Sequence, residues 1–153
     1  NMHGVALGIA RRAIDVVHKL AGEKTLVPEL LLMKNVPRVR VALARAEGML
    51  GAARAYSYET MDRIWEALRS EGRLSHELRL HLSLSRVNAF QMARDVAQLM
   101  MDTAGSSSIY ASSPLDRLLR DAITLRTHVA VQERLMESTA ALAVGEDPPV
   151  PFL

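Results

Sequence analysis

The sequence contains no cysteine, which removes disulfide bonds, thiolate metal sites and cysteine nucleophiles from its possible chemistry. We expect no signal peptide, and the sequence has no charge-free stretch of roughly 18 residues, the minimum for a membrane-spanning helix. Lysine and arginine number 19 against 17 acidic residues, and no run of like charge concentrates the surplus as nucleic-acid binding requires. We therefore expect a cytoplasmic protein that binds neither a membrane nor a nucleic acid.

Proline is absent between Pro37 and Pro114. A chain of strands and tight turns would be interrupted more often than this, so we expect helices to fill the gap. Apolar and small residues recur there every three or four positions, which places them on single helical faces. Together with a similar stripe after Pro114, these faces also include the hydroxyl side chains Ser57, Thr60, Ser85 and Thr139.

Glycine and serine mark where the helices end and begin. Gly72 and Gly105 lie in the two breaks, and Ser75 and Ser113 follow them at the positions of N-terminal caps. Short turns between long helices predict an all-α fold, an antiparallel up-down four-helix bundle that forms a single domain. We predict helices over residues 2–22, 36–70, 75–104 and 114–144, a loop over 23–35 and an extended tail over 145–153.

The helices carry two further signals about packing. Their apolar stripes are broad enough to cover more than one neighbour, which predicts a homo-oligomer. Gly48 and Gly51 lie one turn apart inside the second helix, where each costs about 1 kcal/mol relative to alanine. We expect a close helix crossing to compensate for them.

The motifs of common helical and nucleotide-binding sites are missing. A di-iron bundle carries Glu-x-x-His pairs, because that spacing places both ligands on one inward face, and this sequence has none. It also lacks the Gly-x-Ser-x-Gly elbow, the phosphate loop and the Gly-x-Gly-x-x-Gly turn. We predict no metal site, and the hydrolase and nucleotide-fold classes are disfavoured.

A polar line on the last predicted helix is open to two interpretations. Arg117, Asp121, Thr124 and His128 recur at spacings of four, three and four, so they share one face. They can be a solvent-exposed face held by an Arg117–Asp121 ion pair, or a row of residues that take part in the protein's function. The serines of the preceding loop, 106–108, can likewise be flexible turn residues or donors to an anion.

Several stretches, taken in order, resemble one known domain: Gly105 to Tyr110, Ser112 to Leu115, Arg117 to Ala122 and Thr124 to His128. They are similar to the end of the carboxy-terminal helical domain of the acyl-CoA dehydrogenase superfamily. Residues 8–15 and 53–56 resemble its first two helices, so the likeness covers nearly the whole chain. The resemblance implies a carboxy-terminal domain whose amino-terminal helical and β domains belong to the same, longer flavoenzyme.

Two branches of the superfamily differ at this segment. Acyl-CoA dehydrogenases carry the motif Tyr-Glu-Gly-Thr, whose glutamate is in many members the catalytic base, where this sequence reads His128 to Val131. A histidine there resembles the two-component flavin-dependent monooxygenases, which act on aromatic or polycyclic compounds. The dehydrogenase motif Phe-Gly-x-Pro-Leu is also absent from residues 30–43. The resemblance therefore implies a monooxygenase that uses reduced FMN or FAD.

The resemblance also implies roles for individual residues. His128 would be the acid/base partner of the oxygen-loaded flavin or of the substrate hydroxyl, because an imidazole can hold and transfer a proton near neutral pH. Thr124, one helical turn behind, would contact the cofactor and fix the tautomer of that ring. The flavin phosphate or ribityl chain would lie beside Ser107, Ser108 and Tyr110. Structural or interface contacts to a neighbour would come from Arg117, Arg120 and Asp121.

The expected partners follow from the same resemblance. They are other copies of this chain in a tetramer, the remaining domains of the enzyme and a flavin reductase. Two alternatives stay open at this point: a dehydrogenase whose base lies elsewhere, and a structural bundle without a cofactor.

Overall fold

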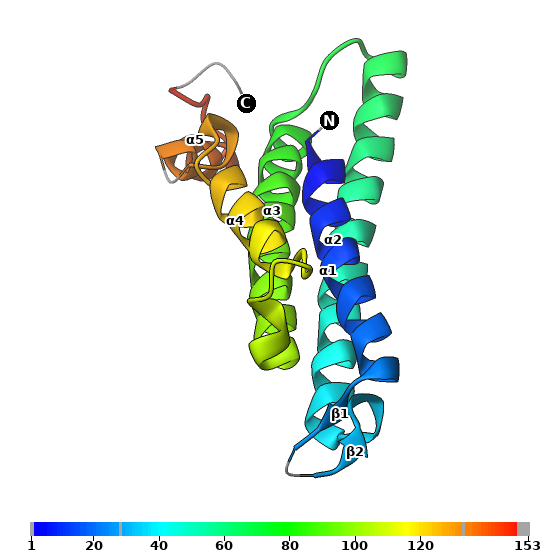
Figure 1. Ribbon diagram of the computed structural model, residues 1–153. Coiled ribbons are helices and arrows are strands. Elements are labelled where there is room, and N and C mark those ends of the chain that lie inside the picture. The colour runs from blue at the N-terminus through cyan, green and yellow to red at the C-terminus, as the bar shows by residue number, and fades with distance from the viewer. Residues whose placement is uncertain (1, 28, 133, 150–153) are drawn as a thin grey trace.

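The computed structural model describes residues 2–27, 29–132 and 134–149. The described part is almost entirely helical, which confirms the all-α fold class (Figure 1). A two-residue hairpin joins the first two helices, with Thr25 paired to Leu32 and Leu26 to Leu31. The helices are α1 (His3–Glu23), α2 (Pro37–Ser70), α3 (His76–Ala104), α4 (Leu115–Leu125) and α5 (Arg134–Ala143), and the strands are β1 (Thr25–Leu26) and β2 (Leu31–Leu32).

The first three helices begin and end within one residue of the predicted bounds because their caps are local in sequence. Ser75 precedes α3 and its Oγ accepts a hydrogen bond of 3.2 Å from the Leu78 amide. Pro37 begins α2, where its missing N–H would have no partner in any case. Gly105 ends α3 with a φ of 59°, a conformation that other residues rarely adopt.

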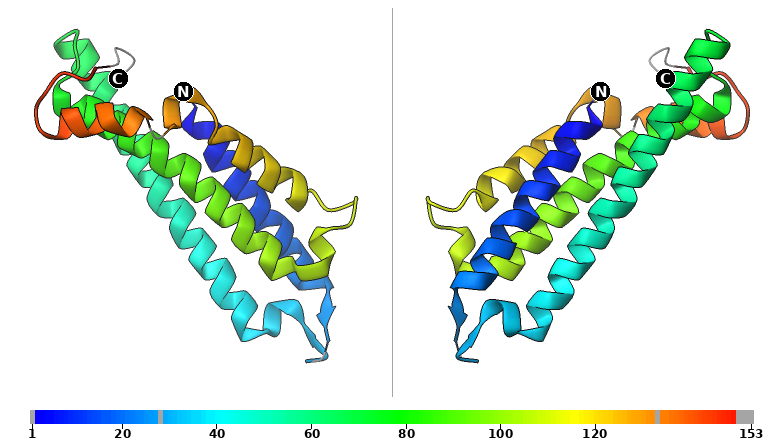
Figure 2. Two further views of the ribbon diagram at one scale, coloured as in Figure 1. Left: turned by 90° about the vertical axis from the view of Figure 1, so that its left-hand side faces the viewer. Right: turned by 90° about the vertical axis from the view of Figure 1, so that its right-hand side faces the viewer.

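Helix α3 is the centre of the bundle, since it contacts α1, α2, α4 and α5. Helices α2 and α3 run antiparallel, while α1 and α4 lie beside α3 (Figures 1 and 2). The hairpin closes the end of the bundle where α1 finishes and α2 begins, and α5 covers the opposite end of α3. None of the described helices combines the length and apolar character needed to cross a bilayer.

The predicted helix over 114–144 is wrong in its middle. Helix α4 ends at Leu125, a short 3₁₀ turn occupies Val129–Val131, and α5 begins at Arg134. The carbonyl oxygen of Thr124 accepts from both the amide and the hydroxyl of Thr127, at 3.0 and 2.8 Å. The Gln132 side-chain amide donates to the Thr127 carbonyl at 2.7 Å, in place of the next helical bond. Local side-chain bonds therefore replace the helix.

Two smaller expectations are also corrected. The predicted loop over 23–35 contains the β1–β2 hairpin and a 3₁₀ turn at Met33–Asn35. A Cβ added to Gly48 or Gly51 would have no atom within 4 Å, so the expected close crossing does not occur within the described chain.

The start of the predicted tail is irregular and is held at the beginning of α3. Asp147 lies 3.1 Å from Nε2 of His76 and 3.8 Å from the guanidinium of Arg79. Residues 150–153 lie outside the described part of the chain.

Candidate functional site

The loop that follows α3 folds back on itself before α4 begins. Residues Gly105–Ser108 form a 3₁₀ turn, and the Ser108 hydroxyl donates to the Gly105 carbonyl at 2.7 Å. Ser108 is buried, so its side chain is already committed within the turn. Of the three predicted flavin-contacting residues of the loop, Ser108 therefore has the clearest structural role, whereas Tyr110 is 63% exposed.

Ser107 is held by a residue that is distant in the sequence. The Lys24 ammonium, just after the end of α1, donates to Ser107 Oγ at 2.7 Å and to the Ala104 carbonyl at 3.3 Å. This pair joins the end of α1 to the end of α3. Nothing in the spacing of the sequence indicated Lys24, since 83 positions separate it from Ser107.

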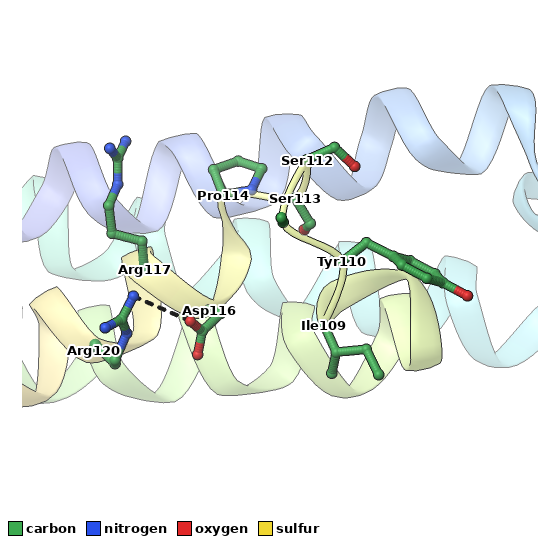
Figure 3. A pocket seen from close by; sticks show the side chains of 9 residues that line it. Ile109, Tyr110, Ser112, Ser113, Pro114, Asp116, Arg117 and Arg120 are labelled. Carbon is green, nitrogen blue, oxygen red and sulfur yellow. Dashed lines mark ion pairs between the residues drawn. The ribbon is translucent and has the colours of Figure 1, made fainter.

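A concave pocket of about 390 Å³ lies between the loop and the first turn of α4 (Figure 3). Its wall combines hydroxyl groups, apolar side chains and charged groups of α4. The lining residues are Ile109, Tyr110, Ala111, Ser112, Ser113, Pro114, Asp116, Arg117 and Arg120.

The ion pair of α4 differs from the expected one. Asp116 and Arg120 pair at 3.2 Å, while the described residues contain no Arg117–Asp121 pair. An acidic residue four positions before a basic one complements the helix dipole, and the reverse order does not, which favours the observed pair. Figure 3 shows Arg117 directed away from the Asp116–Arg120 pair. Both Arg120 and Asp121 are exposed, and within the described chain neither forms an ion pair with another helix.

His128 does not lie on α4, contrary to expectation. It is exposed and begins the 3₁₀ turn beyond the helix, where its Nδ1 accepts a hydrogen bond of 3.1 Å from the Ala130 amide. Because an amide can only donate, the neutral ring must carry its proton on Nε2. Ala130, rather than Thr124, therefore fixes the tautomer. The Thr124 side chain is exposed and, within the described chain, forms no hydrogen bond with the ring.

The candidate residues form two groups at opposite ends of α4. Ser107, Ser108 and Tyr110 precede its first turn, and His128 follows its last. An 11-residue helix is about 16 Å long, so one small group cannot touch both. The phosphate end and the ring end of a flavin nucleotide are themselves separate, so the two groups can serve different parts of one ligand or ligands of different subunits.

The groups with perturbed pKa values lie away from this loop. Burial lowers the pKa of His3, and the nearby positive charge of Arg86 lowers it further. His3 is 4% exposed and its Nε2 lies 3.1 Å from Ser85 Oγ. Burial also lowers the pKa of Arg86, whose buried Nε has no hydrogen-bond partner among the described residues. Among the described side chains, no cluster of three or more histidine, aspartate or glutamate residues could hold a metal ion.

Comparison with known proteins places this bundle in a class, the helical carboxy-terminal domains of flavin-linked oxidoreductases. The profile described as "Acyl-CoA dehydrogenase, C-terminal domain" matches residues 2–133. The chain belongs to this family.

Two proteins named as monooxygenases are among the relatives and structures that this chain resembles. The indole-3-acetate monooxygenase of Pseudomonas putida is 31% identical over 144 residues, which are 94% of this chain and 37% of that protein. The structure of XiaF from Streptomyces sp. in complex with FADH2 and glycerol has a TM-score of 0.88 at 22% identity, covering 99% of this chain and 39% of XiaF. The dibenzothiophene monooxygenase TdsC from Paenibacillus sp. A11-2 has a TM-score of 0.80 at 19% identity, covering 98% of this chain and 39% of TdsC. The chain thus spans less than two-fifths of each relative's length.

Proposed function

We propose that this chain is the flavin-binding and oligomerisation domain of a two-component flavin-dependent monooxygenase. The enzyme would use reduced FMN or FAD and oxygen to hydroxylate an aromatic or polycyclic substrate. The observation that carries the proposal is the 31% identity with an indole-3-acetate monooxygenase over 94% of this chain. The name of the TdsC structure supports a substrate range that includes fused aromatic rings.

The residues around α4 fit a flavin nucleotide. The loop offers the Lys24–Ser107 pair and the exposed hydroxyls of Ser106, Ser112 and Tyr110 as donors to phosphate or ribityl oxygens. Exposed Ile109 and the ring of Tyr110 add apolar surface beside them. A bound reduced flavin supplies the two electrons with which one oxygen atom enters the substrate and the other becomes water.

His128 would hold a proton at a defined atom. With Nδ1 engaged by the Ala130 amide, the ring presents Nε2–H as a donor to the reacting oxygen or to the substrate hydroxyl. To act as a base through Nε2, the ring would have to move its proton to Nδ1 and release Ala130. The arrangement therefore favours the donor role over the base role for the neutral ring.

The exposed side of α2 supports assembly into a homotetramer. Large apolar side chains at Val41, Tyr58, Trp65 and Leu68 are between 45 and 67% exposed on this chain. Gly48 and Gly51 face open space on the same helix, where a second copy or another domain could approach closely. In the complete enzyme these surfaces would be covered by other copies of the chain or by its other domains. A separate flavin reductase would supply the reduced cofactor.

The alternative is a dehydrogenase of the same family whose base lies elsewhere. The stretch His128 to Val131, without a carboxylate, disfavours it.

The test uses the full-length protein with a flavin reductase, NADH and oxygen on one side, and anaerobic acyl-CoA thioesters on the other. We expect oxygen-dependent hydroxylation of indole-3-acetate or a related aromatic compound. Bleaching of bound oxidised flavin by acyl-CoA would overturn the proposal, and a protein that binds no flavin would leave only a structural bundle.

A further inference from the structure

Lys24 and Ser107 form a hydrogen bond whose direction is fixed by chemistry. An ammonium group has only protons to offer, so Ser107 Oγ must be the acceptor in the 2.7 Å contact with Lys24 Nζ. The hydroxyl proton of Ser107 is then left for another acceptor. No described residue accepts it, so this proton is available to a ligand.

Lys24 also changes the electrostatics at this place. The loop begins at the carboxyl end of α3, where the last carbonyl groups carry partial negative charge and repel an anion. The Lys24 ammonium lies 3.3 Å from one of these carbonyls, that of Ala104, and supplies a full positive charge. Lys24 and Ser107 are both partly buried, so solvent screens this charge less than at an open surface.

We infer that Lys24 is a positioning residue that holds Ser107 as a hydrogen-bond donor to the phosphate of the flavin. Phosphate oxygens accept hydrogen bonds only, so they match a hydroxyl whose acceptor function is already used. This inference rests on the proposed function and adds to it a residue that sequence spacing did not indicate. Lys24 acts through Ser107, and the charge at its Nζ makes an anionic group the preferred ligand.

Ser108 provides the contrast within the same turn. Its hydroxyl is buried and donates to the Gly105 carbonyl, so it offers no proton to a ligand. Ser108→Ala should disturb the turn without changing the preference for a phosphorylated flavin. Ser107→Ala should change that preference.

The experiment measures flavin affinity in the full-length protein, by anaerobic titration with reduced FMN, FAD and riboflavin. Riboflavin shares the ring and ribityl chain but lacks the phosphate. Lys24→Met should weaken the binding of FMN and FAD by about tenfold or more, because it removes one charge-assisted hydrogen bond. The same substitution should weaken the binding of riboflavin by less than about twofold, because riboflavin has no phosphate. Lys24→Arg should restore part of the loss, and Ser107→Ala should add little in the Lys24→Met background. Lys19→Met, at an exposed lysine of α1, is the matched control.

Each outcome decides between the alternatives. If Lys24→Met lowers the melting temperature and weakens riboflavin and FMN equally, Lys24 only caps α3 and the inference is overturned. If the wild-type protein prefers phosphorylated flavins and Lys24→Met keeps that preference, the inference fails while the proposed function stands. If the wild-type protein binds none of the three flavins, both are overturned.

Discussion

The two ends of the bundle are held together by different side chains. At the end closed by the hairpin, the largest fully buried residues are apolar. At the end covered by α5, the fully buried residues of the same class are serines. The first group comprises Ile14, Val17, Met33, Val39, Val96, Met100 and Leu115, the second comprises Ser83, Ser85 and Ser138, and Phe90 lies between them at the middle of α3.

The hydroxyl-rich end depends on directed bonds. Ser83 Oγ lies 2.6 Å from Thr139 Oγ1, and the Thr139 hydroxyl donates to the Leu135 carbonyl at 2.8 Å, so Ser83 is the donor of the pair. This relay fixes α5 against α3. Apolar packing has no fixed direction, so it tolerates small shifts of the helices. A buried hydroxyl that loses its hydrogen-bond partner lowers the stability of the fold. The comparison therefore predicts that the apolar end supplies most of the stability, and the polar end supplies the register of α5.

The largest expected effect is a cavity at the apolar end. Met100→Ala should lower the free energy of unfolding by about 2–5 kcal/mol, because the residue is fully buried and its packing cannot be replaced. Urea denaturation measures the change. Met100→Leu, which conserves volume, should cost less than about 1.5 kcal/mol. If Met100→Ala lowers the free energy of unfolding less than Thr139→Val does, the apolar end does not supply most of the stability.

The next effect concerns the relay at the polar end. Thr139→Val should cost about 1–3 kcal/mol, because it leaves the Ser83 proton buried without its acceptor. Adding Ser83→Ala should recover part of that loss, since both polar groups are then gone. Strict additivity of the two changes in urea denaturation would show that the two hydroxyls do not interact.

Two serines in this half of the bundle should behave in the opposite way. Ser57 Oγ and Ser138 Oγ are buried, and neither has a hydrogen-bond partner among the described residues. Ser138→Ala should stabilise the chain by up to about 1 kcal/mol, because it removes an unpaired hydroxyl and improves helix propensity. The same substitution at Ser85, which contacts His3, is the control and should destabilise. A loss of stability in Ser138→Ala would mean that its hydroxyl has a partner in solution.

The smallest effect at neutral pH comes from His3. Its pKa is lowered by burial, so the folded state prefers the neutral ring. The stabilisation is complete above the unfolded pKa of about 6.5 and is lost as pH falls below it, because the unfolded chain takes up the proton first. His3→Gln should flatten the fall in melting temperature between about pH 7.5 and about pH 5. Parallel curves for wild type and His3→Gln would contradict the burial argument.

The sequence was sufficient to predict the helices that have local caps and continuous stripes. The predicted stripes of α2 and α3 are buried along most of their length, including the hydroxyls at Ser57, Thr60 and Ser85.

The stripe predicted for the last helix is buried in α4, at Leu118 and Ala122, and again in α5 at Thr139, but not between the two helices. Beyond α4, Val129 is exposed, because side-chain bonds at Thr127 and Gln132 end the helix. Periodicity does not register such bonds, so the sequence pattern continued where the helix did not.

The candidate site could be predicted only in part. Loop residues and His128 were found because a resemblance ties them together in order. The Lys24–Ser107 pair, the Asp116–Arg120 pair and the Ala130 amide on His128 depend on how the chain folds, and no motif in the sequence indicated them.

The most direct test of the account is the source of the oxygen atom in the product. Full-length protein is supplied with reduced flavin, an aromatic substrate and ¹⁸O₂, and the product is analysed by mass spectrometry. A flavin-dependent monooxygenase places one labelled atom in the hydroxylated product. A product without label, or one oxidised equally well under nitrogen, would contradict the account.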